Sequence, residues 1–241
     1  MQKGIITRLV SHKILYNLKI KNANFDEIFN FYSTKYSLSL RDRKLVNNIV
    51  LNSMRYNTLI DKIITRYVKK KINIDQYLLI LSATTQMIFL NFKSYAVIHS
   101  TVELSKKNNF KIFPGFINAV LKNILNDKDK IKNTQAQYKN LPGWFIEHNQ
   151  NWELNEKFLF LNSINKKPDL HIVFKNIQSV KKFNYKKMHA SKTSLVISNQ
   201  LPIKLLPRFD KGEWWIQDYA SMLPLYLTSN IKNKTVLDMC A

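Results

Sequence analysis

Apolar residues in the first half of the chain recur at intervals of three and four positions, the spacing that gathers them on one face of an α-helix. The first stripe runs from Ile5 to Leu18 and leaves the basic side chains of that segment largely off the apolar face. The same spacing predicts helices over 25–32, 40–54, 59–67, 77–90, 94–106 and 116–126. Because no strand-like run of useful length occurs before Asp127, the pattern predicts an all-α domain over residues 1–126.

Polar residues that can cap a helix stand at the start of several of these segments. Asn24 precedes the second segment, and Ser39 with Asp42 is similar to a capping box at the start of the third. A break near Asn57 separates the third segment from the fourth. Asn73 opens a segment that is apolar nearly all round, so we expect this helix at the centre of the bundle.

The second half of the chain has a different pattern of apolar and polar residues. Residues 127–140 are charged and almost free of large apolar groups, which predicts a linker. Strand-like runs occur at 169–175, 194–197, 213–216 and 235–239, and helices are expected at 153–164, 177–183 and 219–227. This alternation predicts a mixed α/β or α+β subdomain over 141–230, and the last run predicts the first strand of a further domain over 231–241.

The charge changes the picture most: 38 Lys and Arg against 16 Asp and Glu give a net charge of +22. An excess of this size favours polyanionic partners, above all nucleic acid. A bias of the coding DNA towards A and T would also enrich Lys, Asn and Ile, and this alternative stays open. No apolar run approaches the ~18 residues of a membrane span, and no signal peptide is evident, so we expect no membrane partner. The lone cysteine excludes an internal disulfide and predicts a reducing compartment, by default the cytoplasm.

Most catalytic templates are excluded by the residues. The five histidines and Cys240 show no metal-ligand spacing, so no metal site is predicted. A nucleophile elbow and a phosphate-cradling loop are both missing from the sequence. No glycine follows Gly212, although a cofactor turn of the Rossmann type needs residues without Cβ. These residues therefore cannot form a complete dinucleotide or nucleoside site.

Two segments near the C-terminus carry a resemblance. Residues 212–221 read GEWWIQDYAS and residues 234–241 read KTVLDMCA. They resemble the segments "G-x-x-x-[VI]-Q-D-x-A-[AS]" and "V-L-D-x-C-A-A-P-G-G-K" of bacterial RNA cytosine-5 methyltransferases. The second motif binds S-adenosylmethionine, which implies a partial cofactor site at Asp238, Cys240 and Ala241. Asp238 as a simple strand end is an equal alternative. The resemblance places the nucleophilic cysteine downstream of these residues, so no catalytic residue is assigned.

A second resemblance lies in the helical half. Residues 42–43, 52–55, 96–103 and 115–122 fall in the order of the motifs of NusB-like RNA-binding domains. The "Y-G-x-[LV]-R" motif appears as NSMR, and the expected Arg-Arg pair appears as Lys122-Asn123. Four cations are candidates for contacting RNA: Arg8, Lys13, Arg43 and Lys122. For the first three, a solvated charge on the outer face of a helix is the alternative.

Together the two resemblances are those of the RsmB (Sun/Fmu) type of 16S ribosomal RNA (cytosine-5) methyltransferase. They imply an all-α NusB-like bundle, an α/β (α+β) subdomain and the first strand of a truncated Rossmann-like methyltransferase domain. The implied cofactor is S-adenosylmethionine and the implied partner small-subunit ribosomal RNA. DNA is not expected as a partner, a monomer is expected, and these 241 residues should bind RNA without methylating it. The alternatives are a stand-alone NusB-like RNA-binding or antitermination factor with an accessory domain, and a purely structural interaction module.

Several single residues have two interpretations. His99, in an apolar helix, is expected to be a packed or capped structural histidine. Trp144, Trp214 and Trp215 could stack on RNA bases, but core packing is expected for at least two of them. Asp218 could flank a cofactor or base pocket, or act as the N-cap of the helix that follows it.

Overall fold

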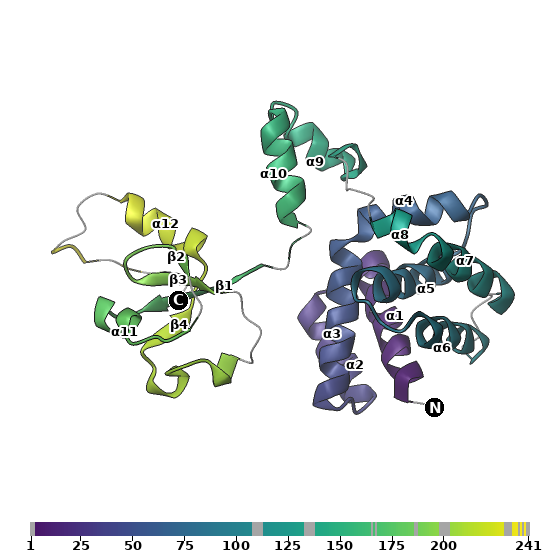
Figure 1. Ribbon diagram of the computed structural model, residues 1–241, viewed down its shortest axis with the longest axis horizontal. Coiled ribbons are helices and arrows are strands. Elements are labelled where there is room, and N and C mark those ends of the chain that lie inside the picture. The colour runs from purple at the N-terminus through teal and green to yellow at the C-terminus, as the bar shows by residue number, and fades with distance from the viewer. Residues whose placement is uncertain are drawn as a thin grey trace. The chain divides into compact units, whose positions relative to one another are not determined.

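The computed structural model describes residues 3–107, 113–132, 138–164, 166, 168–185, 188–197, 203–228, 233–235, 237 and 239. The chain divides into two compact units, Met1–Lys166 and Lys167–Ala241 (Figure 1). This boundary lies later than the predicted one at residues 140–141. No helix among the described residues is long and apolar enough to cross a membrane.

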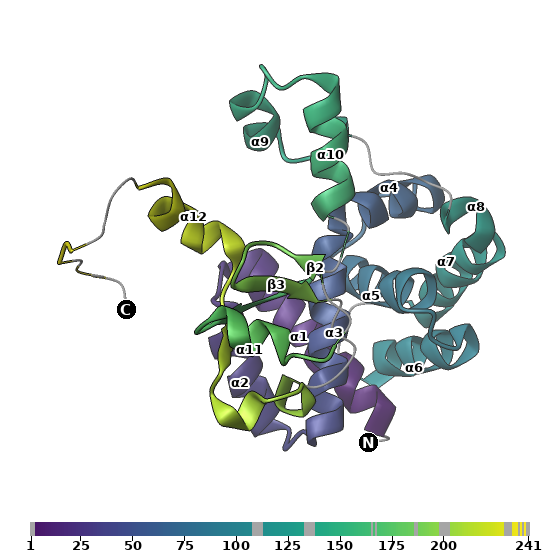
Figure 2. The same cartoon turned by 60° about the vertical axis from the view of Figure 1, so that its left-hand side comes forward.

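The first unit is a bundle of helices. Its principal elements are α1 (Lys3–Lys21), α2 (Phe25–Lys35), α3 (Leu40–Arg55), α4 (Asn57–Tyr67), α5 (Ile74–Thr84), α6 (Ser94–Lys107) and α7 (Pro114–Asn126). Helix α1 packs against α2, α3, α5 and α6 (Figure 2). Val10 and Ile14 of α1 and Leu78 and Ile80 of α5 are completely buried in the shared core. The all-α prediction for residues 1–126 is confirmed, including the break at Asn57.

The predicted caps are present at three helix starts. The Asn24 side chain accepts hydrogen bonds from the backbone N–H of Asp26 and of Glu27. Ser39 Oγ accepts from the backbone N–H of Asp42 at 3.2 Å. At the start of α5, Asn73 and Gln76 form a reciprocal capping box, in which each side chain accepts a hydrogen bond from the backbone N–H of the other residue. Each cap satisfies backbone donors that the first turn of a helix leaves without partners.

Helix α5 lies at the centre of the bundle, as its pattern predicts, but it does not continue regularly to Leu90. It passes into a π-helical turn, η1 (Thr85–Phe89), in which the backbone N–H of Leu90 bonds to Thr85 O at 3.0 Å. Polar side chains bond back to the preceding turn here: Thr85 Oγ1 donates to Leu81 O and Gln86 Nε2 to Ser82 O. Such turns interrupt helices where local side-chain bonds compete with the regular ladder.

The predicted linker at 127–140 is wrong for its first half. Residues Lys128–Lys132 form a short helix, α8, and Ile131 is buried in the core of the bundle. Burial of this one apolar side chain anchors the otherwise charged segment to the bundle. After a 3₁₀ turn, η2 (Tyr138–Asn140), follow α9 (Gly143–His148) and α10 (Leu154–Ile164), which share their own aromatic cluster. In that cluster the rings of Phe145 and Phe160 stack with centroids 4.7 Å apart.

The second unit is built on a four-stranded antiparallel sheet in the order β2-β3-β1-β4. The strands are β1 (Leu170–Phe174), β2 (Met188–His189), β3 (Ser194–Ile197) and β4 (Trp214–Ile216). The shorter elements are α11 (Ile177–Lys181), η3 (Ile203–Leu205), η4 (Phe209–Lys211) and α12 (Tyr219–Leu227). A core of its own, which includes Ile172, Phe183 and Trp214, fills one side of the sheet. The antiparallel pairing makes this unit α+β.

Two predictions for this part of the chain need correction, and one strand was not predicted. The strand expected at 235–239 is not found among its described residues, where Leu237 is 81% and Met239 87% exposed. A strand needs a neighbour to bond with, and the four described strands pair only with one another. The two-residue β2 was not predicted. Of the three tryptophans only Trp214 is buried, whereas Trp144 and Trp215 are exposed.

Candidate nucleic-acid interface

Positive charge is concentrated in the helical domain. Residues 1–126 contain 20 Lys and Arg against six Asp and Glu, which is a net +14 of the +22 of the whole chain. A field of this sign attracts phosphate backbones over distances of about a Debye length, 8 Å at physiological salt. The candidates for contact with phosphate are therefore the cations of α1 to α7 that have no protein partner among the described residues.

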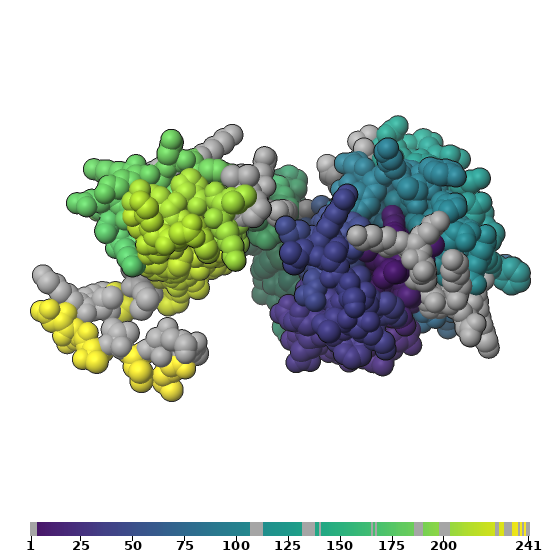
Figure 3. All heavy atoms as spheres, turned by 90° about the horizontal axis from the view of Figure 1, so that it is seen from below, coloured from purple at the N-terminus to yellow at the C-terminus, as the bar shows by residue number. Residues whose placement is uncertain are grey.

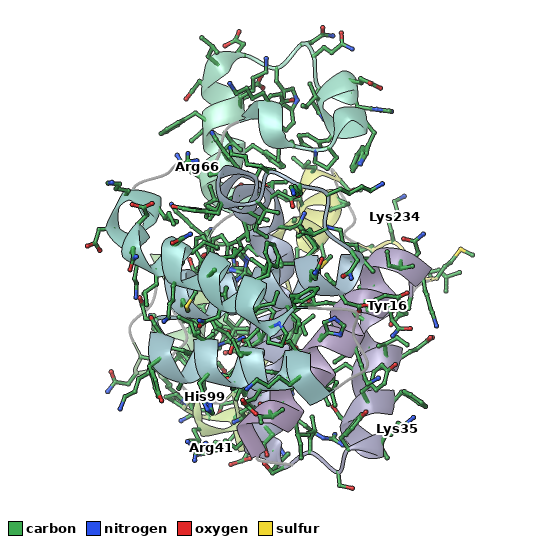
Figure 4. All side chains as sticks on the ribbon, turned by 90° about the vertical axis from the view of Figure 1, so that its right-hand side faces the viewer. Tyr16, Lys35, Arg41, Arg66, His99 and Lys234 are labelled. Carbon is green, nitrogen blue, oxygen red and sulfur yellow. The ribbon has the colours of Figure 1, made fainter. Side chains whose placement is uncertain are left out.

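A hollow of about 310 Å³ opens between α1, α2 and the start of α5. We call it the tyrosine hollow; it is lined by His12, Lys13, Tyr16, Asn17, Lys21, Tyr32 and Asp75. Five of these residues come from α1, where positions three, four and eight apart share a face. Figure 4 labels Tyr16 on this helix. Asn17 Nδ2 donates to Tyr32 OH at 3.2 Å and so joins α1 to α2 across the hollow.

The side chains of the tyrosine hollow suit RNA chemically. Lys13 and Lys21 supply cations for phosphate, and neither ammonium group has a hydrogen-bond or ion-pair partner among the described residues. Tyr16 and Tyr32 offer ring faces and hydroxyl groups, the donors and stacking surfaces that single-stranded RNA uses. Asp75 is the one carboxylate in the lining, and it faces His12, with Nε2 and Oδ1 3.2 Å apart.

His12 fixes the floor of the hollow in its neutral form. The side chain is only 3% exposed, and burial lowers its pKa to about 4, although the Asp75 carboxylate opposes that shift. The neutral imidazole leaves the positive charge of the hollow to the two lysines. The sequence alone gave no reason to single out this histidine, because a buried His is usually a core residue.

Two other cations of α1, Lys19 and Arg8, contact groups of the protein itself. Lys19 Nζ lies 4.2 Å from the ring centroid of Tyr77 and 3.0 Å from its hydroxyl. Burial and the hydrogen bond to Asp61 raise the pKa of Tyr77, so the ring stays neutral. Arg8 donates from Nη1 to Gly4 O at 2.9 Å, and burial lowers its pKa to about 10. The Arg8 side chain is half-buried, and this geometry favours a structural role over a solvated charge.

The remaining predicted cations lie on other helices. Arg43 is half-buried in the first turn of α3, and Lys122 is exposed on α7. Residues of α2 and α3 form the violet and blue surface that faces the viewer in Figure 3. Lys122 lines a groove between α6 and α7, which shares no lining residue with the tyrosine hollow. The four predicted cations thus do not form one cluster.

A run of exposed cations escaped the sequence analysis. Lys69, Lys70 and Lys71 follow α4 directly, and Arg66 in its last turn is also exposed (Figure 4). The end of α4 is tied down by Tyr67, whose hydroxyl donates to Asp127 Oδ2 at 2.8 Å. The signal was visible as a basic tetrad in RYVKKK, but a run of lysines on its own is usually only a solvated loop.

The structure also corrects His99. This residue is exposed, and its ring stacks on that of Tyr95, one helical turn earlier, with centroids 6.1 Å apart. The expectation of a packed or capped histidine is wrong because α6 buries Val97 and Ile98 and turns the next position outward. Asp218 does precede α12 as predicted, but its side chain makes no capping bond. His171 Nδ1 instead accepts from the backbone N–H of Tyr219 at 3.0 Å.

The implied cofactor cannot be placed on the described residues. Asp238, Cys240 and Ala241 lie outside them, and Leu237 and Met239 belong to no strand. Gly212, the last glycine, sits in a turn before β4 with a φ of +56°, and a Cβ added there would meet no atom within 4 Å. Within the described ranges no three His, Cys, Asp or Glu residues come together as metal ligands.

Comparison with known proteins agrees with the helical architecture. Residues 6–126, half of the chain, match the NusB family. The chain belongs to the NusB family. The match covers α1 to α7, and so it contains both the tyrosine hollow and the groove between α6 and α7.

One curated relative extends the similarity into the second unit. The "Probable ribosomal RNA small subunit methyltransferase B" of Coxiella burnetii (strain RSA 493 / Nine Mile phase I) is 25% identical over 227 residues. These cover 85% of this chain and 52% of that protein, so the chain spans about half the length of this relative. Since the NusB match accounts for only half of the chain, the similarity to this relative continues well past residue 126.

Two crystal structures resemble parts of the chain at 21% identity. One, of a plectonemic RNA supercoil, has a TM-score of 0.49 and covers 56% of this chain and 100% of its own. The other, of antitermination factors NusB and NusE in complex with dsRNA, has a TM-score of 0.48 and covers 52% and 98%.

Proposed function

We propose that this chain is the RNA-recognising part of an S-adenosylmethionine-dependent methyltransferase that modifies a cytosine of small-subunit ribosomal RNA. The observation that carries the proposal is the extent of the similarity to the Coxiella relative, which includes the α+β unit as well as the NusB-family domain. A stand-alone NusB-like factor with an accessory domain would leave the similarity of that second unit to a methyltransferase unexplained. The motif-like segment 212–221, which begins at Gly212 and ends in α12, supports the same reading.

RNA would be held mainly by the helical domain. Its charge of +14 attracts the phosphate backbone, and the tyrosine hollow supplies lysines, ring faces and an amide within one concave site. Lys13 is the predicted contact that this geometry supports best. Arg43 and Lys122, at other places on the bundle, are proposed as outlying phosphate contacts. Ribosomal RNA in the cytoplasm is the expected partner, and the protein is expected to act as a monomer.

Methyl transfer is assigned to residues of the parent enzyme beyond those described. The 241 residues contain no glycine after Gly212, so we expect them to bind neither S-adenosylmethionine nor its analogues measurably. In this proposal residues 1–126 bind RNA, and residues 141–230 connect them to the catalytic domain. Asp238, Cys240 and Ala241 remain the proposed entry to its cofactor turn.

Salt-dependent RNA binding tests the proposal directly. The 241-residue chain is titrated with small-subunit ribosomal RNA and with a DNA duplex of equal length, at 50 to 300 mM salt. We expect tighter binding to the RNA and a linear fall of log K with log salt, because each phosphate contact releases a counterion. Binding that does not distinguish ribosomal RNA from DNA would leave only a non-specific polyanion binder. Isothermal titration with S-adenosylmethionine should give no heat above dilution.

A further inference from the structure

A groove of about 670 Å³ runs between α6 and α7, separate from the tyrosine hollow. We call it the α6–α7 groove; it is lined by Tyr95, Ile98, His99, Val102, Glu103, Lys106, Pro114, Gly115, Asn118, Lys122 and Leu125. The α6 residues among them are three and four positions apart, so they form one continuous helix face. Most of the lining is apolar, and cations stand at its rim. The label of His99 in Figure 4 marks its position on α6.

An aromatic platform lies at one end of the groove. Tyr95 is 82% exposed, and its ring is stacked on that of His99 with an angle of 24° between the planes. A tyrosine normally buries most of its ring, because the exposed face costs free energy in water. Here the free face is presented to solvent beside a hollow, in the arrangement that stacking on a nucleobase requires.

Gly115 leaves open space on the α7 side of the groove. It is the second residue of α7, and a Cβ added there would meet no atom within 4 Å. The backbone conformation at this position does not demand glycine, since its φ is not in the left-handed region. The missing side chain therefore leaves open space without being required by the fold.

The rim of the groove carries charge suited to RNA. Lys122 is exposed, and its ammonium group has no hydrogen-bond or ion-pair partner among the described residues. Lys106 pairs with Glu103 at 2.7 Å but keeps half of its side chain exposed. Asn118 places an amide in the lining, with both donors and an acceptor for the edge of a base.

We propose that the α6–α7 groove binds an unpaired RNA base, which stacks on Tyr95 while a neighbouring phosphate meets Lys122. This inference rests on the proposed RNA-binding function and adds a second, single-strand-specific subsite to it. An apolar peptide helix would also fill the groove, but it would bury Lys106 and Lys122 against apolar groups at a desolvation cost. An RNA strand instead supplies the phosphates that complement them, on a domain whose net charge is +14.

Two pairs of variants test the subsite in the full 241-residue chain. Tyr95→Leu removes the aromatic face and keeps an apolar side chain, whereas Tyr95→Phe keeps the face. Gly115→Leu fills the groove, whereas Gly115→Ala adds a methyl group to open space and favours the helix. The probes are a 12-nucleotide single-stranded RNA with one 2-aminopurine and the corresponding RNA duplex, at fixed salt. Circular dichroism checks that all four variants are folded.

We expect Tyr95→Leu and Gly115→Leu to weaken binding of the single strand about tenfold, the effect of losing one base–aromatic stack. The duplex should bind as before, and Tyr95→Phe and Gly115→Ala should match the original chain. Quenching of 2-aminopurine on binding should disappear in Tyr95→Leu. Equal single-strand affinity for all five proteins would overturn the subsite. No binding of any RNA by the original chain would instead overturn the proposed function itself.

Discussion

The Nε2 atom of His12 lies 3.2 Å from Oδ1 of Asp75, and this contact joins the middle of α1 to the first turn of α5. The imidazole is buried, whereas the carboxylate keeps about a third of its side chain in solvent. Burial outweighs the attraction of the carboxylate and lowers the pKa of His12 to about 4. The same pair lines the tyrosine hollow, so the stability of the bundle and the shape of the proposed RNA site both depend on one neutral histidine.

Stability should fall as the pH drops through the range in which only the unfolded chain protonates His12. The unfolded side chain titrates near 6.5 and the folded one near 4, so the unfolded state binds more protons between these values. The bundle should therefore be most stable above pH 6.5 and lose up to about 3 kcal/mol by pH 4. Urea unfolding at pH 7, 6, 5 and 4.5 measures this loss. His12→Gln cannot titrate, and an unchanged pH slope in that variant would contradict the assignment.

Lys13 and Arg8 should differ in what they contribute to RNA binding, although both are cations of α1. Lys13 lines the tyrosine hollow, whereas Arg8 bonds to Gly4 O of its own helix. Lys13→Gln should reduce the slope of log K against log salt by about 0.7 to 0.9, the value of one phosphate contact. Arg8→Gln, the same chemical change five residues earlier, should leave the slope unchanged. Equal slopes for both variants would remove Lys13 from the interface.

The capping box of α5 should stabilise the bundle measurably. Asn73 Oδ1 accepts from the backbone N–H of Gln76 at 2.8 Å, and Gln76 Oε1 accepts from the backbone N–H of Asn73 at 3.1 Å. Asn73→Ala leaves the backbone N–H of Gln76 to water and should cost about 1 kcal/mol of unfolding free energy. Asn73→Asp or Asn73→Ser should restore most of it, because either side chain can accept the same bond. Denaturant midpoints of the three variants provide the comparison.

The helical half could be predicted from the sequence because its signals are local. Apolar spacing fixes which face of each helix is buried, and caps such as Asn24 and Asn73 depend on residues within one turn. Even the central position of α5 follows from an apolar surface that leaves no polar face for water. Where a feature depends on distant residues the prediction failed: Ile131 docks only because the bundle leaves space for it.

The candidate site was less predictable than the fold. The tyrosine hollow needs the relative placement of α1, α2 and α5, which the pattern of any one helix does not contain. His99 was misread because its neighbours are apolar, although the residue four positions earlier, Tyr95, gives the stacking geometry directly. The charge predicted a polyanionic partner. Only the structure distinguished Lys19, which contacts the ring of Tyr77, from Lys13, which lines the tyrosine hollow.

The turn before β4 should require glycine at position 212 because of its backbone conformation, and not because a side chain would clash there. Gly212 has φ +56°, and an added Cβ would meet nothing within 4 Å, so no clash contributes. On either side of the turn Arg208 and Glu213 form an ion pair, which lowers the pKa of Glu213. Gly212→Ala should cost about 1 kcal/mol of the stability of the sheet unit, and Gly212→Asn less, since asparagine tolerates the left-handed region. Amide hydrogen exchange of β1 and β4 reports this loss locally.

The helical bundle should fold without the rest of the chain. Among the described residues, the buried cluster of the bundle runs from Ile5 to Ile131, and a separate cluster in the sheet unit begins at Ile172. A polypeptide of residues 1–132 should keep its helical circular dichroism, unfold in one cooperative transition and bind single-stranded RNA with the salt slope of the full chain. It retains both the tyrosine hollow and the α6–α7 groove, which is why its affinity should change little. If this polypeptide folds but has lost most of its RNA affinity, the main contacts lie after residue 132, and the interface belongs to the second half of the chain.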